Sequence, residues 1–495
     1  LRDGKVYATE LPKDATYPHS IKVTFEDGKL TCQVQKRACN FMRALVPGDA
    51  IPGISNTHAR GDSLVEVKVP QDAKPGDTLI LNTDQKDASK VHSLRFPMGA
   101  PTPVEPLEDL QRHLGLQQVL KENGGTWNPK IERASTDRLI VPGIVATESI
   151  SKGEVLVRCP PHLLLSSQAV RQMAPAFAVI AAEAANELAF DRGNVDIALQ
   201  ATFIASLVAA SEDPSTRGPT ILHEGKRVVW EAFLKVLRCE TFAQHPYRLA
   251  AQDPVAFKSA LLPSCEADLI EYLAWTVVQW YDIVTSCSSA YKAPLLFSPE
   301  QFLRAWLLVT TRAFDVDGTR TTLVPGLDSF NHDPLRASAR AAPDGTGGML
   351  IAATRDIQSG EEIFLLYQKF SNSELYRTYG FTLPEVQQQT LTILPSRVRF
   401  LLLKHLPPSH AGRLIEFHSG MLHPTLVAAV KACAGEGKNY IAFLRELLQF
   451  FAEAYERDPQ MKDVIQTKTA TEDILRVKLS EYRCLQRYLQ SLDDP

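Results

Sequence analysis

The chain has 495 residues, which exceeds what one hydrophobic core usually holds, so we expect two or three domains. Its 44% hydrophobic and 22% charged residues are ordinary for a soluble globular protein, and a net charge of −4 does not favour a nucleic acid as partner. No apolar run reaches the roughly 20 residues of a membrane span, so we expect no membrane partner either.

The eight cysteines are scattered, with no C-x-x-C pair and no Cys/His cluster at zinc spacing. This pattern argues against a structural metal and against a secreted disulfide framework. We therefore expect no metal and a reducing, intracellular compartment, with the cytoplasm, a plastid and the nucleus all left open. Because the chain starts at Leu1, removal of an organellar transit peptide also stays open.

The N-terminal region is expected to be β-structured between residues 17 and 82. Residues 21–25 alternate, residues 26–29 give a hairpin turn signal, and residues 64–69 alternate again before a strand at 78–81. The last piece resembles, over a short stretch, a strand–turn–strand unit of the peptide-binding β-domains of J-domain co-chaperones. We expect a small β accessory domain over residues 1–96.

Beyond this region, β and helical stretches alternate. A stiff linker is expected over residues 97–106, followed by a short helix from about Leu107. Residues 136–164 predict β structure, 165–315 mostly helix, 320–367 β structure with loops, and 395 onward helix. Three apolar stripes are expected to pack in cores: Phe302, Trp306, Val309 and Ala313; Phe443, Leu447, Phe450 and Ala454; Leu475, Leu479, Tyr482, Leu485 and Leu489.

One pattern, A-T-x-x-I-x-x-G-E, occurs twice, at residues 146–154 and at residues 353–361. In both copies a β run enters a polar turn closed by glycine and leaves as β. Two unrelated hairpins could match by chance, but we favour one β domain that is interrupted by a long helical insertion at about residues 165–315.

Four motifs follow the expected helical stretch in order: D-x-x-N-H at 328–332, G-E-E-I-x-x-x-Y at 360–367, S-N-x-E-L at 371–375 and Y-G-F at 379–381. This ordered set resembles the SET-domain methyltransferases, and especially the subgroup of the Rubisco large-subunit methyltransferase. That subgroup also shows the repeated hairpin, a helical insertion and a helix end S-R-A-F, which residues 311–314 match with Thr in place of Ser. The resemblance covers about residues 135–390, and loosely 391–495.

The resemblance implies methyl transfer from S-adenosylmethionine to a protein side chain. That reaction is an in-line displacement at a sulfonium, which demands alignment of donor and acceptor in a partly dry channel. Burial lowers the pKa of a lysine amine, and aromatic faces favour the cationic sulfonium and ammonium. The reaction requires no metal.

By the same resemblance, Tyr367 is the catalytic channel tyrosine, although a strand-end tyrosine can also simply pack its ring. Asn331 and His332 match the pair that holds the amino-acid and adenine parts of the cofactor; alone, Asn-His in a loop is usually turn chemistry. Tyr379 matches an aromatic position beside the cofactor, with core packing against Phe381 as the alternative.

Other matches are less complete. The family's N-terminal cofactor loop, G-x-G-L-V-A, falls on residues 141–146, where Gly143 is kept and Val141 replaces the first glycine; Ile140, Pro142 and Gly143 are the candidate cofactor-binding residues there. Arg312 and Asp328 match substrate-side positions, with a salt bridge or helix-end charge and a turn-forming Asp as alternatives. An aromatic residue that some members place after Asn-His is absent, which leaves the channel shape and the number of methyl groups open.

The sequence thus predicts an α+β protein with a SET β-fold. We expect the SET domain over residues 107–390 and an all-helical C-terminal substrate-binding domain over 391–495. The expected activity is S-adenosylmethionine-dependent methylation of a lysine side chain in a non-histone protein, by a monomer. The sequence leaves open a protein-histidine methyltransferase of the actin type and a catalytically inactive SET-like protein-binding module.

Overall fold

The structure is a computed structural model of the chain. It describes six strands in the N-terminal region, and then residues 106–134, 142–188, 194–212, 230–235, 242–290, 297–316, 318–384, 390–393, 415–418, 431, 440–467, 470 and 472–492. Ile140 and the expected linker, apart from Pro106, lie outside the described residues.

The N-terminal strands form two antiparallel sheets, in the orders β1-β5-β6 and β3-β2-β4. In the second sheet Glu26 pairs with Lys29, which confirms the predicted hairpin. The strand bounds are β1 (Val6–Glu10), β2 (Ser20–Glu26), β3 (Lys29–Gln35), β4 (Val65–Lys68), β5 (Thr78–Thr83) and β6 (Val91–Ser93).

A helix longer than expected precedes the central sheet. α1 (Pro106–Glu122) has 17 residues, whereas the sequence suggested a short helix. It continues because Leu116 and Leu120 are buried against the sheet core, so packing outweighs the low helix propensity of Gly115. The helix is followed by Gly124, whose φ of 83° suits only a residue without a side chain.

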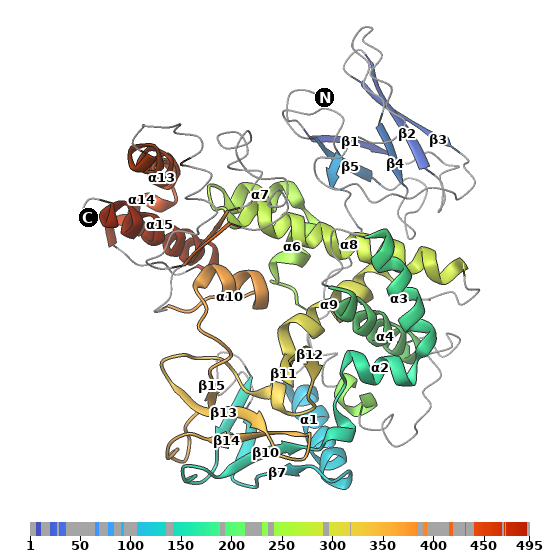
Figure 1. The fold of residues 1–495 in the computed structure, drawn as a ribbon, viewed down its shortest axis with the longest axis vertical. Helices are drawn as coiled ribbons and strands as arrows, with labels where there is room; N and C mark the ends of the chain where they lie inside the picture. The colour runs from blue at the N-terminus through green and yellow to red at the C-terminus, as the bar shows by residue number, and fades with distance from the viewer. Residues whose placement is uncertain are drawn as a thin grey trace.

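The central sheet has five strands in the order β15-β13-β14-β10-β7. β10 pairs antiparallel with β14, although nearly 200 residues, which include the helical insertion, separate them in the chain. Figure 1 shows this sheet at one end of the molecule with α1 against it. The bounds are β7 (Thr126–Trp127), β10 (Val155–Cys159), β13 (Ala337–Pro343), β14 (Met349–Ala353) and β15 (Phe364–Leu365), with β8 (Ile131–Ala134) and β9 (Gly143–Ala146) in a separate pair.

The two copies of the repeated pattern bind each other through matched backbone hydrogen bonds. Ile150 N–H donates to the Ile357 carbonyl at 3.0 Å, and Ile357 N–H donates back at 2.9 Å. Gly153 N–H donates to Ala353 O at 2.8 Å, and its counterpart Gly360 N–H donates to Ala146 O at 2.7 Å. Each glycine has a φ near +90°, at 89° and 85°, which is why the turn position requires glycine. The copies are therefore two halves of one folded unit.

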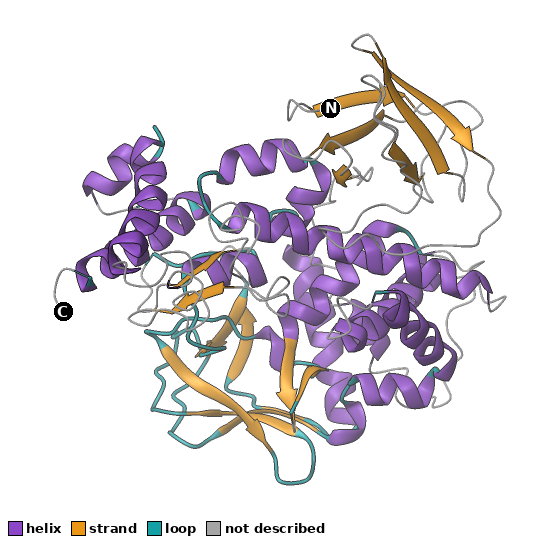
Figure 2. Ribbon diagram, turned by 45° about the horizontal axis from the view of Figure 1, so that its top comes forward, coloured by secondary structure: helices purple, strands orange, loops and turns teal. Residues whose placement is uncertain are grey.

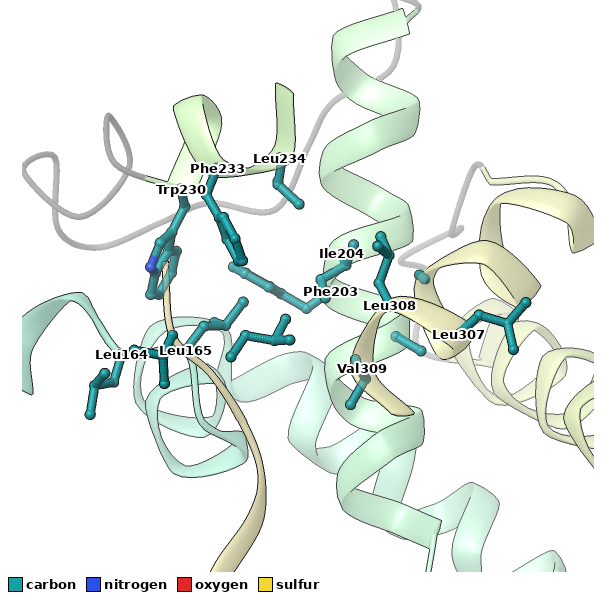
Figure 3. Close-up of a cluster of buried hydrophobic side chains, with 14 of the residues drawn as sticks. Leu164, Leu165, Phe203, Ile204, Trp230, Phe233, Leu234, Leu307, Leu308 and Val309 are labelled. Carbon is teal, nitrogen blue, oxygen red and sulfur yellow. The ribbon is translucent and has the colours of Figure 1, made fainter. Parts of the chain in front are cut away.

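Over residues 165–315 the described part of the chain is mostly helical, as the sequence predicted. Figure 2 shows these helices in purple and the strands of the central sheet in orange. Figure 3 shows part of their core, where Phe203 lies near Trp230 and Phe233, and Ile204 lies near Leu308. The helices are η1 (Pro161–Leu163), α2 (Ser167–Met173), α3 (Pro175–Glu187), α4 (Val195–Glu212), α6 (Pro246–Gln252), α7 (Pro254–Leu261), α8 (Glu266–Ala290) and α9 (Pro299–Arg312). They are followed by β11 (Ala313–Val316), β12 (Thr319–Leu323) and η3 (Leu327–Ser329).

α10 (Asn372–Tyr379) leads from the sheet to the C-terminal region. The expected C-terminal helices are present as α13 (Tyr440–Arg457), α14 (Met461–Thr467) and α15 (Asp473–Ser491). The region is not helical throughout, because β16 (Thr390–Ile393) and β17 (Ile415–His418) form an antiparallel pair. Their β-branched residues at Thr390, Thr392, Ile393 and Ile415 favour strands.

One predicted core stripe is rotated on its helix. Phe450 is 62% exposed rather than buried, and the side chain of Phe443 lies outside the described residues. α13 packs instead through Leu444, Leu447, Leu448, Phe451 and Tyr455. Adjacent apolar residues at 447–448 and 450–451 fit either face, so the periodicity alone selected the wrong one. The stripes on α9 and α15 are buried or partly buried, with Ala313 just past the end of α9.

Candidate active site

Two backbone segments that carry the predicted site residues lie next to each other. Leu365 N–H donates to the Asn331 carbonyl at 2.9 Å, and Asp333 N–H donates to the Leu365 carbonyl at 3.2 Å. His332 and Leu365 thereby form a parallel bridge. The D-x-x-N-H and G-E-E-I-x-x-x-Y motifs are thus one structural unit.

His332 links these segments through its ring. The side chain is 5% exposed, and its Nδ1 lies 3.1 Å from the Tyr367 amide and 3.2 Å from the Leu365 carbonyl. Burial lowers the pKa of His332, so the ring is neutral at physiological pH. The Leu365 carbonyl already accepts from Asp333, and an amide can only donate, so we assign Nδ1 as the acceptor and place the proton on Nε2.

Tyr367 is held at both its backbone and its hydroxyl. The hydroxyl donates to the Phe330 carbonyl at 2.6 Å, and the half-buried ring stacks on His332 with centroids 5.0 Å apart. The ring of Tyr379 lies 5.3 Å from that of Tyr367, centroid to centroid. We call His332, Tyr367 and Tyr379 the aromatic row. Its π faces suit a cationic ligand.

Tyr379 stands at the end of α10, where further rings surround it. Phe370 and Phe381 lie 5.7 and 6.0 Å from its ring, so the packing alternative left open by the sequence is also realised. Burial raises the pKa of Tyr379 to about 12, so its hydroxyl stays protonated at neutral pH. α10 itself begins with a capping box in which Ser371 and Glu374 satisfy each other's backbone amides.

Asn331 connects this unit to the first copy of the repeated pattern. Its Nδ2 donates to the Pro142 carbonyl at 3.2 Å and to Glu362 Oε1 at 2.9 Å. Both partners accept, which fixes the amide orientation and turns Oδ1 to the other side. Gly143, next in the chain, is buried in β9. Burial raises the pKa of Glu362, and the hydrogen bond from Asn331 opposes that rise.

Arg312 and Asp328 contact each other. Arg312 Nη1 lies 3.0 Å from Asp328 Oδ2 and also donates to the Asp328 carbonyl at 3.0 Å. The Asp328 side chain is 2% exposed, and burial raises its pKa even though Arg312 and Arg133 act to lower it. Arg133 also donates to the Ser329 carbonyl at 3.2 Å. The salt-bridge alternative stated for Arg312 is therefore realised, and the pair fixes the turn that leads to Asn331.

The predicted site residues thus fall into two groups. Asn331, His332, Tyr367, Tyr379 and Pro142 are joined in one contact network, whereas the Arg312–Asp328 pair reaches it through residues 328–331. The sequence reasoning missed Glu362 and Arg133. Glu362 stands inside the G-E-E-I-x-x-x-Y motif and could have been found, whereas Arg133 carries no local signal.

Within the described residues, no group of His, Cys, Asp and Glu side chains is arranged to hold a metal ion. Over the same residues, no helix combines the length and apolarity that crossing a bilayer would demand.

Comparisons with known proteins match this geometry. Residues 142–368 match the family model of the SET domain. The ribosomal lysine N-methyltransferase set11 of Schizosaccharomyces pombe is 39% identical over 88 residues, which is 17% of this chain and 23% of that protein. Ribosomal lysine N-methyltransferase 4 of the same organism is 40% identical over 68 residues, or 14% of each chain. The chain therefore matches less than a quarter of the length of these curated relatives.

Solved structures share the fold over more of the chain. The SET domain of LSMT bound to lysine and AdoHcy has a TM-score of 0.56 at 15% identity, covering 79% of this chain and 92% of that one. Rubisco LSMT bound to sinefungin and monomethyllysine has a TM-score of 0.54 at 17% identity, with the same coverage. Residues 142–368 thus match the SET domain, and the chain has the fold of the Rubisco LSMT structures.

Proposed function

We propose that this protein transfers a methyl group from S-adenosylmethionine to a lysine side chain of a non-histone protein. The observation that carries the proposal is the contact of Tyr367 with the Asn331–His332 segment, inside the range that matches the SET domain. The named activity of the two yeast relatives supports lysine as the acceptor.

The residues present fit S-adenosylmethionine as cofactor. The Asn331 amide is oriented by two acceptors, so its Oδ1 can accept from the ammonium of the amino-acid part. The rings of Tyr367 and Tyr379 offer π faces to a sulfonium. The bound cofactor supplies the electrophilic methyl group. We assign Asn331, His332, Tyr379, Ile140, Pro142 and Gly143 to cofactor binding.

Tyr367 acts as the catalytic residue in this proposal. Its hydroxyl is fixed by the bond to the Phe330 carbonyl, so its oxygen lone pairs face a constant direction and can align the incoming amine. The neutral His332 ring behind it adds no positive charge that would repel the amine. The surrounding rings exclude water and favour the uncharged lysine nucleophile.

The domain limits also remain our proposal: a β accessory domain over 1–96, a linker over 97–106, a SET domain over 107–390 and a substrate-binding domain over 391–495. Arg312 and Asp328 are proposed to shape the substrate side of the site through the turn that they fix. The substrate is a protein; a monomeric state and the lack of nucleic-acid and membrane partners stay predictions.

The activity can be tested with labelled S-adenosylmethionine. Purified protein is incubated with eukaryotic ribosomes and separately with whole-cell lysate, and modified peptides are identified by mass spectrometry. We expect a methyllysine on one defined protein. A methylhistidine in place of methyllysine would show that the methyl acceptor is a histidine side chain. Calorimetry with S-adenosylhomocysteine separates an enzyme from an inactive module, since a lack of binding at millimolar ligand would rule out the enzyme.

A further inference from the structure

α10 connects the helical insertion to the aromatic row. Tyr376 is buried in a cluster with residues of α6, α7 and α8. Arg377 Nη1 lies 2.6 Å from Glu266 Oε1, whose side chain is 0% exposed, at the start of α8. The next residue, Thr378, accepts through its carbonyl from His245, and Tyr379 then contacts Tyr367. Consecutive residues thus bind the insertion and the site.

His245 comes from a tight turn in the insertion and makes two hydrogen bonds with one ring. Its Nδ1 accepts from the Tyr247 amide at 3.2 Å, which caps α6, and its Nε2 lies 3.2 Å from the Thr378 carbonyl. A neutral ring protonated on Nε2 satisfies both partners. Burial lowers the pKa of His245 to about 4, which keeps the ring in that neutral form.

Two backbone features point to a fitted contact. Phe242 has a φ of 50°, a left-handed conformation that costs energy in a bulky residue and closes the turn through His245 N–H to the Phe242 carbonyl at 3.0 Å. Gly380 has a φ of 79°, and a Cβ there would lie 3.1 Å from His245 Cα. The end of α10 therefore lies directly against the backbone of the His245 turn.

We propose that His245 is a positioning residue, which sets Tyr379 within the aromatic row by holding the Thr378 carbonyl and the Gly380 backbone against the insertion. This inference rests on the proposed function, because its readout is cofactor affinity. The helical insertion is thereby part of the cofactor site, although the described contacts place none of its side chains in the aromatic row.

The two hydrogen bonds can be separated by replacement. His245→Asn keeps an acceptor at the Nδ1 position for the Tyr247 amide and loses the donor to Thr378. His245→Gln keeps a donor at the Nε2 position and loses the cap. Each variant retains one of two bonds, so we expect similar losses in Tm. S-adenosylhomocysteine is the probe, and its Kd is measured by calorimetry for both variants and for the exposed control His162→Asn.

We expect the Kd to rise about tenfold in His245→Asn, the effect of one lost buried hydrogen bond, and to stay within about twofold in His245→Gln. Equal Kd values for the two variants, or a Kd that follows Tm, would overturn the positioning role. If the wild-type protein itself fails to bind, the proposed function falls first and this inference with it. The control should match the wild type in both measurements.

Discussion

Ile150 and Ile357 exchange both of their backbone hydrogen bonds, at 3.0 and 2.9 Å, and lie at the centre of the pairing between the two copies of the repeated pattern. Their side chains are 1% and 0% exposed. We expect Ile150→Ala and Ile357→Ala each to lower the free energy of unfolding by about 2–5 kcal/mol. Because the residues are neighbours, the double variant should deviate from the sum.

Denaturant unfolding measures these losses. Val179→Ala on α3 is the matched control, since Val179 is 47% exposed and loses little burial. A loss at Ile150 or Ile357 that is no larger than the loss at Val179 would contradict the central role of this pairing.

Tyr367→Phe tests the catalytic assignment. The change removes the hydroxyl that donates to the Phe330 carbonyl but keeps the ring against His332 and Tyr379. We expect the single-turnover rate of methyl transfer to fall by about 100-fold, since the amine loses its alignment. The Kd for S-adenosylhomocysteine should stay near the wild-type value. Tyr482→Phe on α15 is the control, and an unchanged rate in Tyr367→Phe would refute the assignment.

Asn331→Asp places a carboxylate where two acceptors require a donor. The Pro142 carbonyl oxygen and the Glu362 carboxylate would then each face a carboxylate oxygen of Asp in place of an N–H donor. We therefore expect the affinity for S-adenosylhomocysteine to fall at least about tenfold. Adding Glu362→Gln supplies an amide donor and removes one charge, so the double variant should recover part of the affinity in calorimetry. No recovery would mean that Glu362 does not orient Asn331.

His245 predicts a pH dependence of stability. Burial lowers its pKa from 6.5 to about 4, so between these values the unfolded chain binds a proton that the folded protein refuses. The stabilisation is complete above pH 6.5 and is lost as the pH falls toward 4, by up to about 3 kcal/mol. His245→Gln should show a flatter stability profile over that window. If the stability of the wild type and of His245→Gln, measured by thermal unfolding, depended on pH in the same way, His245 would not be neutral in the folded protein.

The Arg312–Asp328 pair predicts an asymmetric mutant cycle. Arg312→Ala leaves a carboxylate with a 2% exposed side chain, so we expect a loss of about 3 kcal/mol. The double variant Arg312→Ala, Asp328→Ala should lose less, since no charge stays buried. The pKa of Asp328 is already raised by burial, so the Arg312→Ala variant should regain stability in acid as this carboxyl takes up a proton. A strictly additive cycle would exclude coupling.

Local patterns predicted much of the fold. The repeat at residues 146–154 and 353–361 has a turn glycine in each copy, and such local chemistry is legible in sequence. The buried face of α13 could not be predicted in this way. Adjacent apolar residues at 450 and 451 fit two orientations of the helix, and only tertiary packing decides between them. The hairpin at β16 and β17 has short strands separated by more than twenty residues, beyond the range of any turn signal.

The site divides in the same way. Tyr367 and Asn331 stand in ordered motifs, so each could be proposed as a site residue from the sequence. Their supports could not, because Arg133 and His245 act through backbone carbonyls of residues far along the chain. Every residue has a backbone carbonyl, whatever its side chain, so the sequence does not show which carbonyl accepts such a hydrogen bond.

The pairing of β10 with β14 also sets the order of folding. At about 5–20 residues per second of synthesis, β10 waits on the order of ten seconds or more for its partner to be made. Its hydrogen-bonding edge stays open during that time and is a template for wrong pairing. The intervening helices pack on one another, as α4 does on α9, and are made before β14. They can therefore fold first, which brings the two ends of the sheet together and shortens the search. The insertion is thus a folding scaffold for the sheet that it interrupts.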